Sequence, residues 1–124
     1  MTTAHHSPHL LAITLPDAEP RRDSPGERRL EGDPQFSIWN LDKSAADTLF
    51  AGIWETTPGR WRAAYDGKWE FCTIVQGSLI IIEDGAEPVT YREGDSFVIR
   101  DGFRGTWEAT EPTRKHYVVH MTPR

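Results

Sequence analysis

Apolar and polar residues alternate in short runs from Phe36 onward, and residues that favour turns separate these runs. Such a pattern is typical of an antiparallel sandwich or barrel. The turns are explicit, because Asp66-Gly67, Asp84-Gly85 and Asp101-Gly102 supply residues that tolerate positive φ. We expect strands at residues 36–40, 48–55, 60–65, 69–76, 78–83, 88–91, 96–100, 105–110 and 114–121.

Two segments depart from simple alternation. Residues 79–82 are apolar at every position, so we expect this strand to lie between two layers or in a subunit interface. Residues 43–49 follow Asn40 and Asp42, two candidate N-caps, and are the only segment that could make a short helix.

The first part of the chain has a different composition. All thirteen aromatic residues lie between Phe36 and Tyr117, whereas residues 1–34 contain five of the nine prolines and the charge-dense run 21–33. This segment buries too little apolar surface to fold alone. We therefore predict an extended N-terminal arm over residues 1–34, lying along the barrel or a partner subunit, and one barrel domain over residues 35–124.

Charge and cysteine content restrict the partners. A formal net charge of −5 argues against nucleic acid, which is bound by clustered Lys and Arg. Cys72 is the only cysteine, so no intrachain disulfide can form, as is usual in a reducing compartment. The apolar patch 10–15 lacks the features of a signal peptide, and no stretch reaches the roughly 20 apolar residues of a membrane-spanning helix. We expect a soluble cytoplasmic protein that contacts no membrane.

Four separated motifs, at residues 52–61, 70–77, 94–107 and 114–119, occur in an order that resembles a known family. They are similar to the small bacterial cupins grouped with ureidoglycine aminohydrolase and the ethanolamine-utilisation cupin domains. The resemblance implies an all-β fold, an antiparallel jelly-roll barrel, and a homodimer.

Cupin motifs often place metal ligands inside the barrel, and the resemblance allows these positions to be compared. Glu70 and Gly77 keep the spacing of the first motif, but its two histidines are absent from residues 62–66. In the second motif, Arg100 replaces the usual proline and Gly105 stands where the third histidine would lie. A lone carboxylate does not hold a transition metal, so we expect neither a cupin-type metal nor another cofactor.

The histidines allow two interpretations. His116 and His120 share one face of the last strand, either as part of an unconventional metal site or as surface or interface residues. We favour the second, because Lys115 and Tyr117 match the family motif and should face the other way. His5, His6 and His9 lie in the arm and are interpreted as a solvated tail.

If Glu70 points into the barrel, strand alternation turns Cys72 inward with it, and Lys115 and Tyr117 share a face of the last strand. An aromatic pocket with a few polar groups would result, as in small-ligand sites. Its expected wall residues are Trp54, Glu55, Trp61, Tyr65, Cys72 and Trp107.

The chemistry of this pocket stays open between two readings. In the first, Glu70 is a proton acceptor and Lys115 or Tyr117 is a donor or anion clamp. In the second, Glu70 and Lys115 form a buried ion pair that stabilises the barrel. Cys72 is better explained as a small core residue than as a nucleophile. Most tryptophans are expected in the core, although a cation or sugar could stack on them.

Three functions are compatible with these patterns: a metal-independent enzyme acting on a small polar metabolite, a non-catalytic ligand-binding or regulatory module, and a structural dimer with a filled barrel. The size of the cavity discriminates between them. A solvent-connected void beside Glu70 supports the first two, and a barrel filled by its own side chains supports the third.

Overall fold

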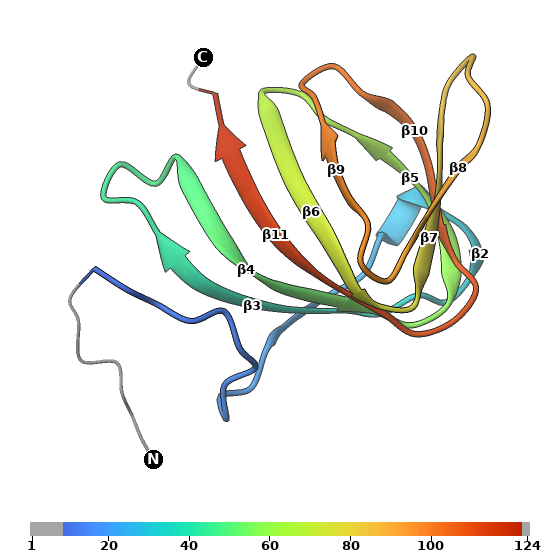
Figure 1. Ribbon diagram of the computed structural model, residues 1–124. Coiled ribbons are helices and arrows are strands. Elements are labelled where there is room, and N and C mark those ends of the chain that lie inside the picture. Colours follow the sequence, from blue (N-terminus) through green and yellow to red (C-terminus); the bar gives the residue numbers. More distant parts are fainter. Residues whose placement is uncertain (1–8, 123–124) are drawn as a thin grey trace.

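Two antiparallel sheets face each other and form a barrel in the computed structural model, which describes residues 9–122 (Figure 1). One sheet has the strand order β1-β3-β4-β11-β6-β9 and the other β2-β5-β10-β7-β8. The predicted all-β antiparallel barrel is confirmed. The strands are β1 Arg21–Asp23, β2 Arg29–Gly32, β3 Phe36–Lys43, β4 Leu49–Thr56, β5 Gly59–Ala64, β6 Lys68–Gln76, β7 Ser78–Glu83, β8 Val89–Arg92, β9 Ser96–Ile99, β10 Arg104–Ala109 and β11 Thr113–Met121, with one 3-10 turn, η1 Gly26–Arg28.

Strand alternation sets the inner and outer faces of the barrel. In β6, Glu70, Cys72 and Ile74 are buried, whereas Phe71 between them is exposed. The core lies between the sheets and gathers the inward residues of most strands. Its cluster comprises Phe36, Trp61, Ala63, Tyr65, Cys72, Ile74, Leu79, Ile81, Phe97, Ile99, Trp107 and Ala109.

The connection between β6 and β7 depends on a glycine. Gly77 has φ +83°, a conformation that side chains disfavour. A Cβ there would lie 2.5 Å from the carbonyl oxygen of Pro112. This turn therefore requires glycine both for its backbone conformation and for close packing.

The predicted helix at residues 43–49 is wrong. The strands β3 and β4 remain paired up to Lys43 and Phe50, which leaves too few residues for a helix. Ser44 closes the connection instead: its backbone N–H donates to the Leu49 carbonyl at 2.9 Å, and its Oγ accepts from the N–H groups of Thr48 and Leu49 at 3.2 and 3.1 Å.

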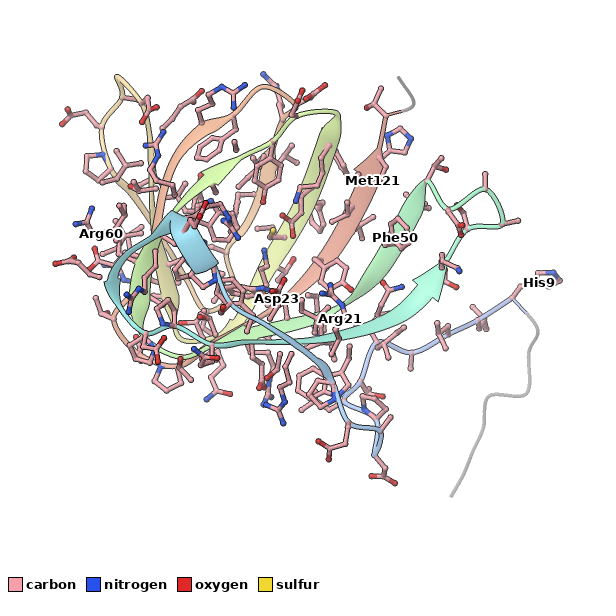
Figure 2. All side chains as sticks on the ribbon, turned by 180° about the vertical axis from the view of Figure 1, so that it is seen from behind. His9, Arg21, Asp23, Phe50, Arg60 and Met121 are labelled. Atoms are coloured by element: carbon pink, nitrogen blue, oxygen red, sulfur yellow. The ribbon has the colours of Figure 1, made fainter. Side chains whose placement is uncertain are left out.

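The arm contributes two short strands that we did not predict. β1 pairs with β3 and β2 pairs with β5, so both add to sheet edges of the barrel (Figure 2). Every residue of these two strands is exposed. Their pairing therefore depends on backbone hydrogen bonds and leaves no alternation of apolar residues to detect. Farther out, the indole of Trp39 donates to the Ala18 carbonyl at 3.0 Å and holds the arm against the barrel.

The apolar strand β7 lies with Leu79 and Ile81 in the core and with Ile80 and Ile82 only partly buried on its other side. Along residues 9–122, nothing forms a helix long and apolar enough to cross a membrane.

Candidate functional site

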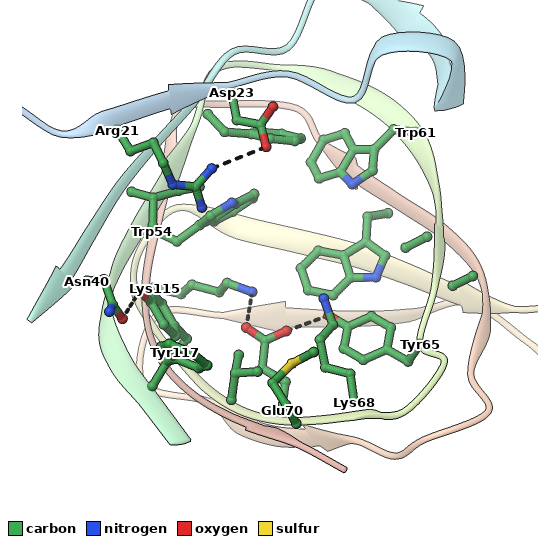
Figure 3. A pocket seen from close by; sticks show the side chains of 18 of the residues that line it. Arg21, Asp23, Asn40, Trp54, Trp61, Tyr65, Lys68, Glu70, Lys115 and Tyr117 are labelled. Carbon is green, nitrogen blue, oxygen red and sulfur yellow. Dashed lines mark hydrogen bonds and ion pairs between the residues drawn. The ribbon is translucent and has the colours of Figure 1, made fainter. Parts of the chain in front are cut away.

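An open cavity of about 670 Å³ lies inside the barrel (Figure 3). Side chains of both sheets line it, and the arm strand β1 passes along its rim with Arg21 and Asp23 (Figure 3). Small-molecule sites typically occupy 300–1,000 Å³. The barrel is therefore not filled by its own side chains.

A carboxylate with two donors stands at the floor of the cavity. Tyr65 donates its phenolic hydrogen to Oε1 of Glu70, and the Lys115 ammonium lies 2.9 Å from Oε2. Both charged residues are buried, with 5% and 3% of their surfaces exposed. The two strands β6 and β11 are paired, so they bring these side chains together from distant parts of the sequence.

The ion pair is charged in its resting state. Burial alone would raise the pKa of Glu70, but the Lys115 ammonium and the Tyr65 hydroxyl lower it overall. Burial alone would lower the pKa of Lys115, but its contacts with Cys72 and Glu70 raise it overall. Burial, followed by the charge of Glu70, raises the pKa of Tyr65 well above its usual value, so this phenol stays protonated.

Two indole rings enclose the Lys115 ammonium. Its Nζ lies 4.7 Å from the ring centre of Trp54 and 4.4 Å from that of Trp107, both within cation–π range. The Sγ of Cys72 lies 3.4 Å away on a third side. Burial raises the pKa of Cys72 to about 12, so the thiol is a neutral core group and not a nucleophile at neutral pH.

Tyr117 lies on the same face of β11 as Lys115 and borders the cavity. Its hydroxyl donates to Oδ1 of Asn40 at 2.9 Å (Figure 3). Burial raises its pKa to about 12. Tyr117 therefore serves as a protonated hydrogen-bonding group of the wall, separate from the Glu70 cluster.

Most of the wall residues named from the sequence meet at this cavity, namely Trp54, Trp61, Tyr65, Glu70, Trp107, Lys115 and Tyr117. Glu55 does not. Because Trp54 points inward, alternation turns Glu55 outward, where it pairs with Arg114 at 2.5 Å. Cys72 points inward but lies beneath Lys115 and is fully buried, so it is not exposed on the cavity wall.

Four charged residues of the cavity were missed from the sequence: Arg21, Asp23 and Arg28 of the arm, and Lys68 of the barrel. Lys68 precedes Glu70 by two residues on one strand, and this spacing could have identified it. The arm residues carried no such signal, because their position depends on pairing between strand edges.

The outer face of the barrel carries His116 and His120, and the structure gives them no role in the cavity. His9 lies in the exposed arm, and His5 and His6 lie outside the described residues. Across residues 9–122 there is no cluster of three His, Cys, Asp or Glu side chains able to hold a metal ion.

The cavity itself does not fit a cupin metal. Ala63 and Tyr65 occupy the wall where the first motif would supply histidines, and Gly105 has no side chain to offer. The Lys115 ammonium already occupies the second oxygen of Glu70. A cation placed there would meet a buried positive charge.

The barrel and its cavity define the cupin class, and comparisons with known proteins agree. Residues 43–117 match the model of the EutQ-like cupin domain. The chain belongs to this family. None of the curated proteins searched matches it.

Solved structures share the fold. A DUF861 protein of unknown function from Pseudomonas syringae pv. tomato is 25% identical, with a TM-score of 0.73 over 83% of this chain and 45% of its own. The chain thus spans less than half of that relative. EutQ of Clostridium difficile is 16% identical, with a TM-score of 0.64 over 88% of this chain and 100% of its own. The putative ethanolamine utilization protein Q of Salmonella typhimurium is 15% identical, with a TM-score of 0.61 over 74% and 72%.

Proposed function

We propose that this protein binds a small polar metabolite inside the barrel without a cupin-type metal ion. The observation that carries the proposal is an open cavity of about 670 Å³ whose floor is a buried, hydrogen-bonded cluster of Tyr65, Glu70 and Lys115. Aromatic walls and a few fixed polar groups are the usual composition of such sites. A purely structural barrel would be filled by its own side chains and would not enclose a cavity of this size.

The five tryptophans provide a direct test. Trp54, Trp61 and Trp107 line the cavity, whereas Trp39 contacts the arm and Trp69 does not line the cavity. Indole N–H resonances, assigned by single Trp→Phe variants, would be followed by NMR while small polar metabolites are added. Binding in the barrel should shift the three cavity resonances and leave the other two in place.

The control is built into the same spectrum. Shifts confined to Trp39 and Trp69 would place binding on the outer surface and contradict the proposal. Saturable shifts of the cavity resonances, lost when Trp54 is replaced by Ala, would support it.

Acid–base chemistry at the cavity floor is a second candidate function, and one observation favours it. The buried Glu70 and Lys115 both belong to the cavity wall, where a bound molecule would meet a carboxylate and an ammonium together. Such a site should exchange an acidic C–H of a bound metabolite with solvent deuterium.

The exchange can be followed by proton NMR in deuterated buffer. It should stop in the double variant Glu70→Gln/Lys115→Met, which removes both charges together and so leaves neither one buried alone. Binding without any exchange would leave the protein a non-catalytic ligand-binding module.

A further inference from the structure

The cavity has the opposite charge to the molecule. The whole chain carries a formal charge of −5. The cavity is lined by four basic and two acidic residues, namely Arg21, Arg28, Lys68, Lys115, Asp23 and Glu70. This local excess of positive charge favours a negatively charged ligand, because field lines concentrate in a cleft with low-dielectric walls.

Pairing within the cavity shows which cations remain available. Glu70 is paired with Lys115 at 2.9 Å, and Asp23 with Arg21 at 3.6 Å. In the described part of the chain, neither Arg28 nor Lys68 has a carboxylate within 4.0 Å. Among the described residues, these two cationic side chains of the cavity therefore form no direct ion pair.

The charge of Arg28 also acts on Lys68. Burial, together with the charges of Lys115 and Arg28, lowers the pKa of Lys68 in spite of the nearby Glu70. Arg28 is held in place by a 2.7 Å hydrogen bond from its Nη1 to the Arg62 carbonyl, and Lys68 lies 4.5 Å above the Tyr65 ring. An anion between them would relieve this repulsion.

The aromatic walls exclude a cationic ligand. The Lys115 ammonium already occupies the space between Trp54 and Trp107, where an external cation would bind by cation–π contact. The protein's own ammonium group therefore already fills this cation–π site of the cavity.

We propose that the ligand is a planar organic carboxylate whose anionic group is bound by Lys68 and the arm residue Arg28, and whose ring stacks against the tryptophan walls. This proposal rests on the proposed function, since it names the class of molecule that the cavity takes. It makes the arm part of the binding site. The barrel alone would lack one of the two charged contacts.

A matched panel of probes tests the charge. Benzoate, nicotinate and indole-3-carboxylate would be compared with their carboxamides and with the corresponding aryl-methylamines, by titration calorimetry and by the tryptophan N–H resonances. Each acid should bind at least about tenfold more tightly than its amide, because a charge-assisted contact is lost in the amide. The amines should not bind, and raising the salt concentration should weaken binding of the acids.

Substitution identifies the contacts. Lys68→Gln and Arg28→Gln should each lower carboxylate affinity about tenfold and leave amide affinity unchanged. The control is Lys43→Gln, which removes an exposed lysine that does not line the cavity. Circular dichroism would establish that each variant is folded. If Arg28→Gln detaches the arm from the barrel, Lys68→Gln still tests the charged contact, because it changes no residue of the arm.

The outcomes separate the two proposals. Amides or amines that bind in the cavity as well as the acids would overturn the carboxylate proposal and leave the proposed function standing. Absence of binding by every probe would overturn the carboxylate proposal alone, and the proposed function would then be decided by the tryptophan titration with non-aromatic metabolites. Equal loss of affinity in Lys43→Gln would show a general effect of net charge and contradict the assigned contacts.

Discussion

At the scale of single residues, the Glu70–Lys115 pair is the most consequential contact of the molecule. Each charge is buried, and each is compensated by the other at 2.9 Å. The pair does not by itself indicate net stabilisation, since desolvation of two charges can cost as much as their attraction returns. Removing one member, however, leaves the other uncompensated in the barrel.

We therefore expect Lys115→Met to destabilise the fold by about 3–5 kcal/mol at pH 7, because it isolates the Glu70 carboxylate. The double variant Glu70→Gln/Lys115→Met should regain most of this loss. Urea denaturation of Lys115→Met, Glu70→Gln, the double variant and the wild type would measure the coupling energy between the two residues. A loss below about 1 kcal/mol in Lys115→Met would contradict the buried pair.

The same variants should differ in their response to pH. In the wild type the pKa of Glu70 is lowered, so its contribution is present above the unfolded pKa of about 4.3 and is lost as pH falls through the folded value. Without Lys115, burial raises that pKa instead, and protonation then relieves the penalty. The stability difference between wild type and Lys115→Met should therefore shrink from pH 7 to pH 4, and a constant difference would contradict this assignment.

At the scale of elements, the barrel depends on tight hairpin connections. Gly77 and Gly85 share the same backbone conformation, with φ +83° at each. Their surroundings differ, since a Cβ at Gly77 meets Pro112 and Thr113 atoms at 2.5 Å, whereas a Cβ at Gly85 meets nothing within 4 Å. The two positions thus separate backbone strain from close packing.

Gly85→Ala should cost about 1 kcal/mol, the strain of a side chain at positive φ. Gly77→Ala should cost about 1–3 kcal/mol more, because the hairpin must also move away from the β10–β11 connection. Thermal and urea unfolding of the two variants would measure the difference. Equal losses would show that the contacts at Gly77 adjust without cost.

At the scale of the whole molecule, three apolar residues lie side by side on the outer face of β6, β9 and β11. Phe71 is paired across β6 and β9 with Val98, and across β6 and β11 with Val118. Phe71 and Val98 remain 38% and 44% exposed. Contiguous exposed apolar residues are one mark of protein interfaces, and we propose that these three form the centre of the contact surface of a homodimer.

Light scattering should then give twice the chain mass of 14.1 kDa at micromolar concentration. Phe71→Glu should convert the protein to a folded monomer, because it places a charge in the centre of the contact. The matched control is Val89→Glu, which changes an equally exposed valine, 46% accessible, on the other sheet. A wild-type monomer, or dissociation by the control, would contradict the proposed surface.

The alternation of apolar residues and the Gly-containing turns determined the strands of the barrel, since each inward or turn position is set by its immediate neighbours. The inward direction of Glu70 was an expectation from the cupin resemblance, and alternation then extended it to Cys72 on the same strand. The local sequence also separated Cys72, as a core thiol, from the reactive groups. Local pattern was sufficient wherever a side chain's direction follows from its own strand.

Only the tertiary structure decided which of these faces meet and what closes over them. The arm strands pair through their backbones, so the positions of Arg21 and Arg28 at the cavity left no trace in the pattern of side chains. The cavity itself is a property of the two packed sheets. Its volume depends on the distance between the sheets and on the sizes of the side chains that face each other across it.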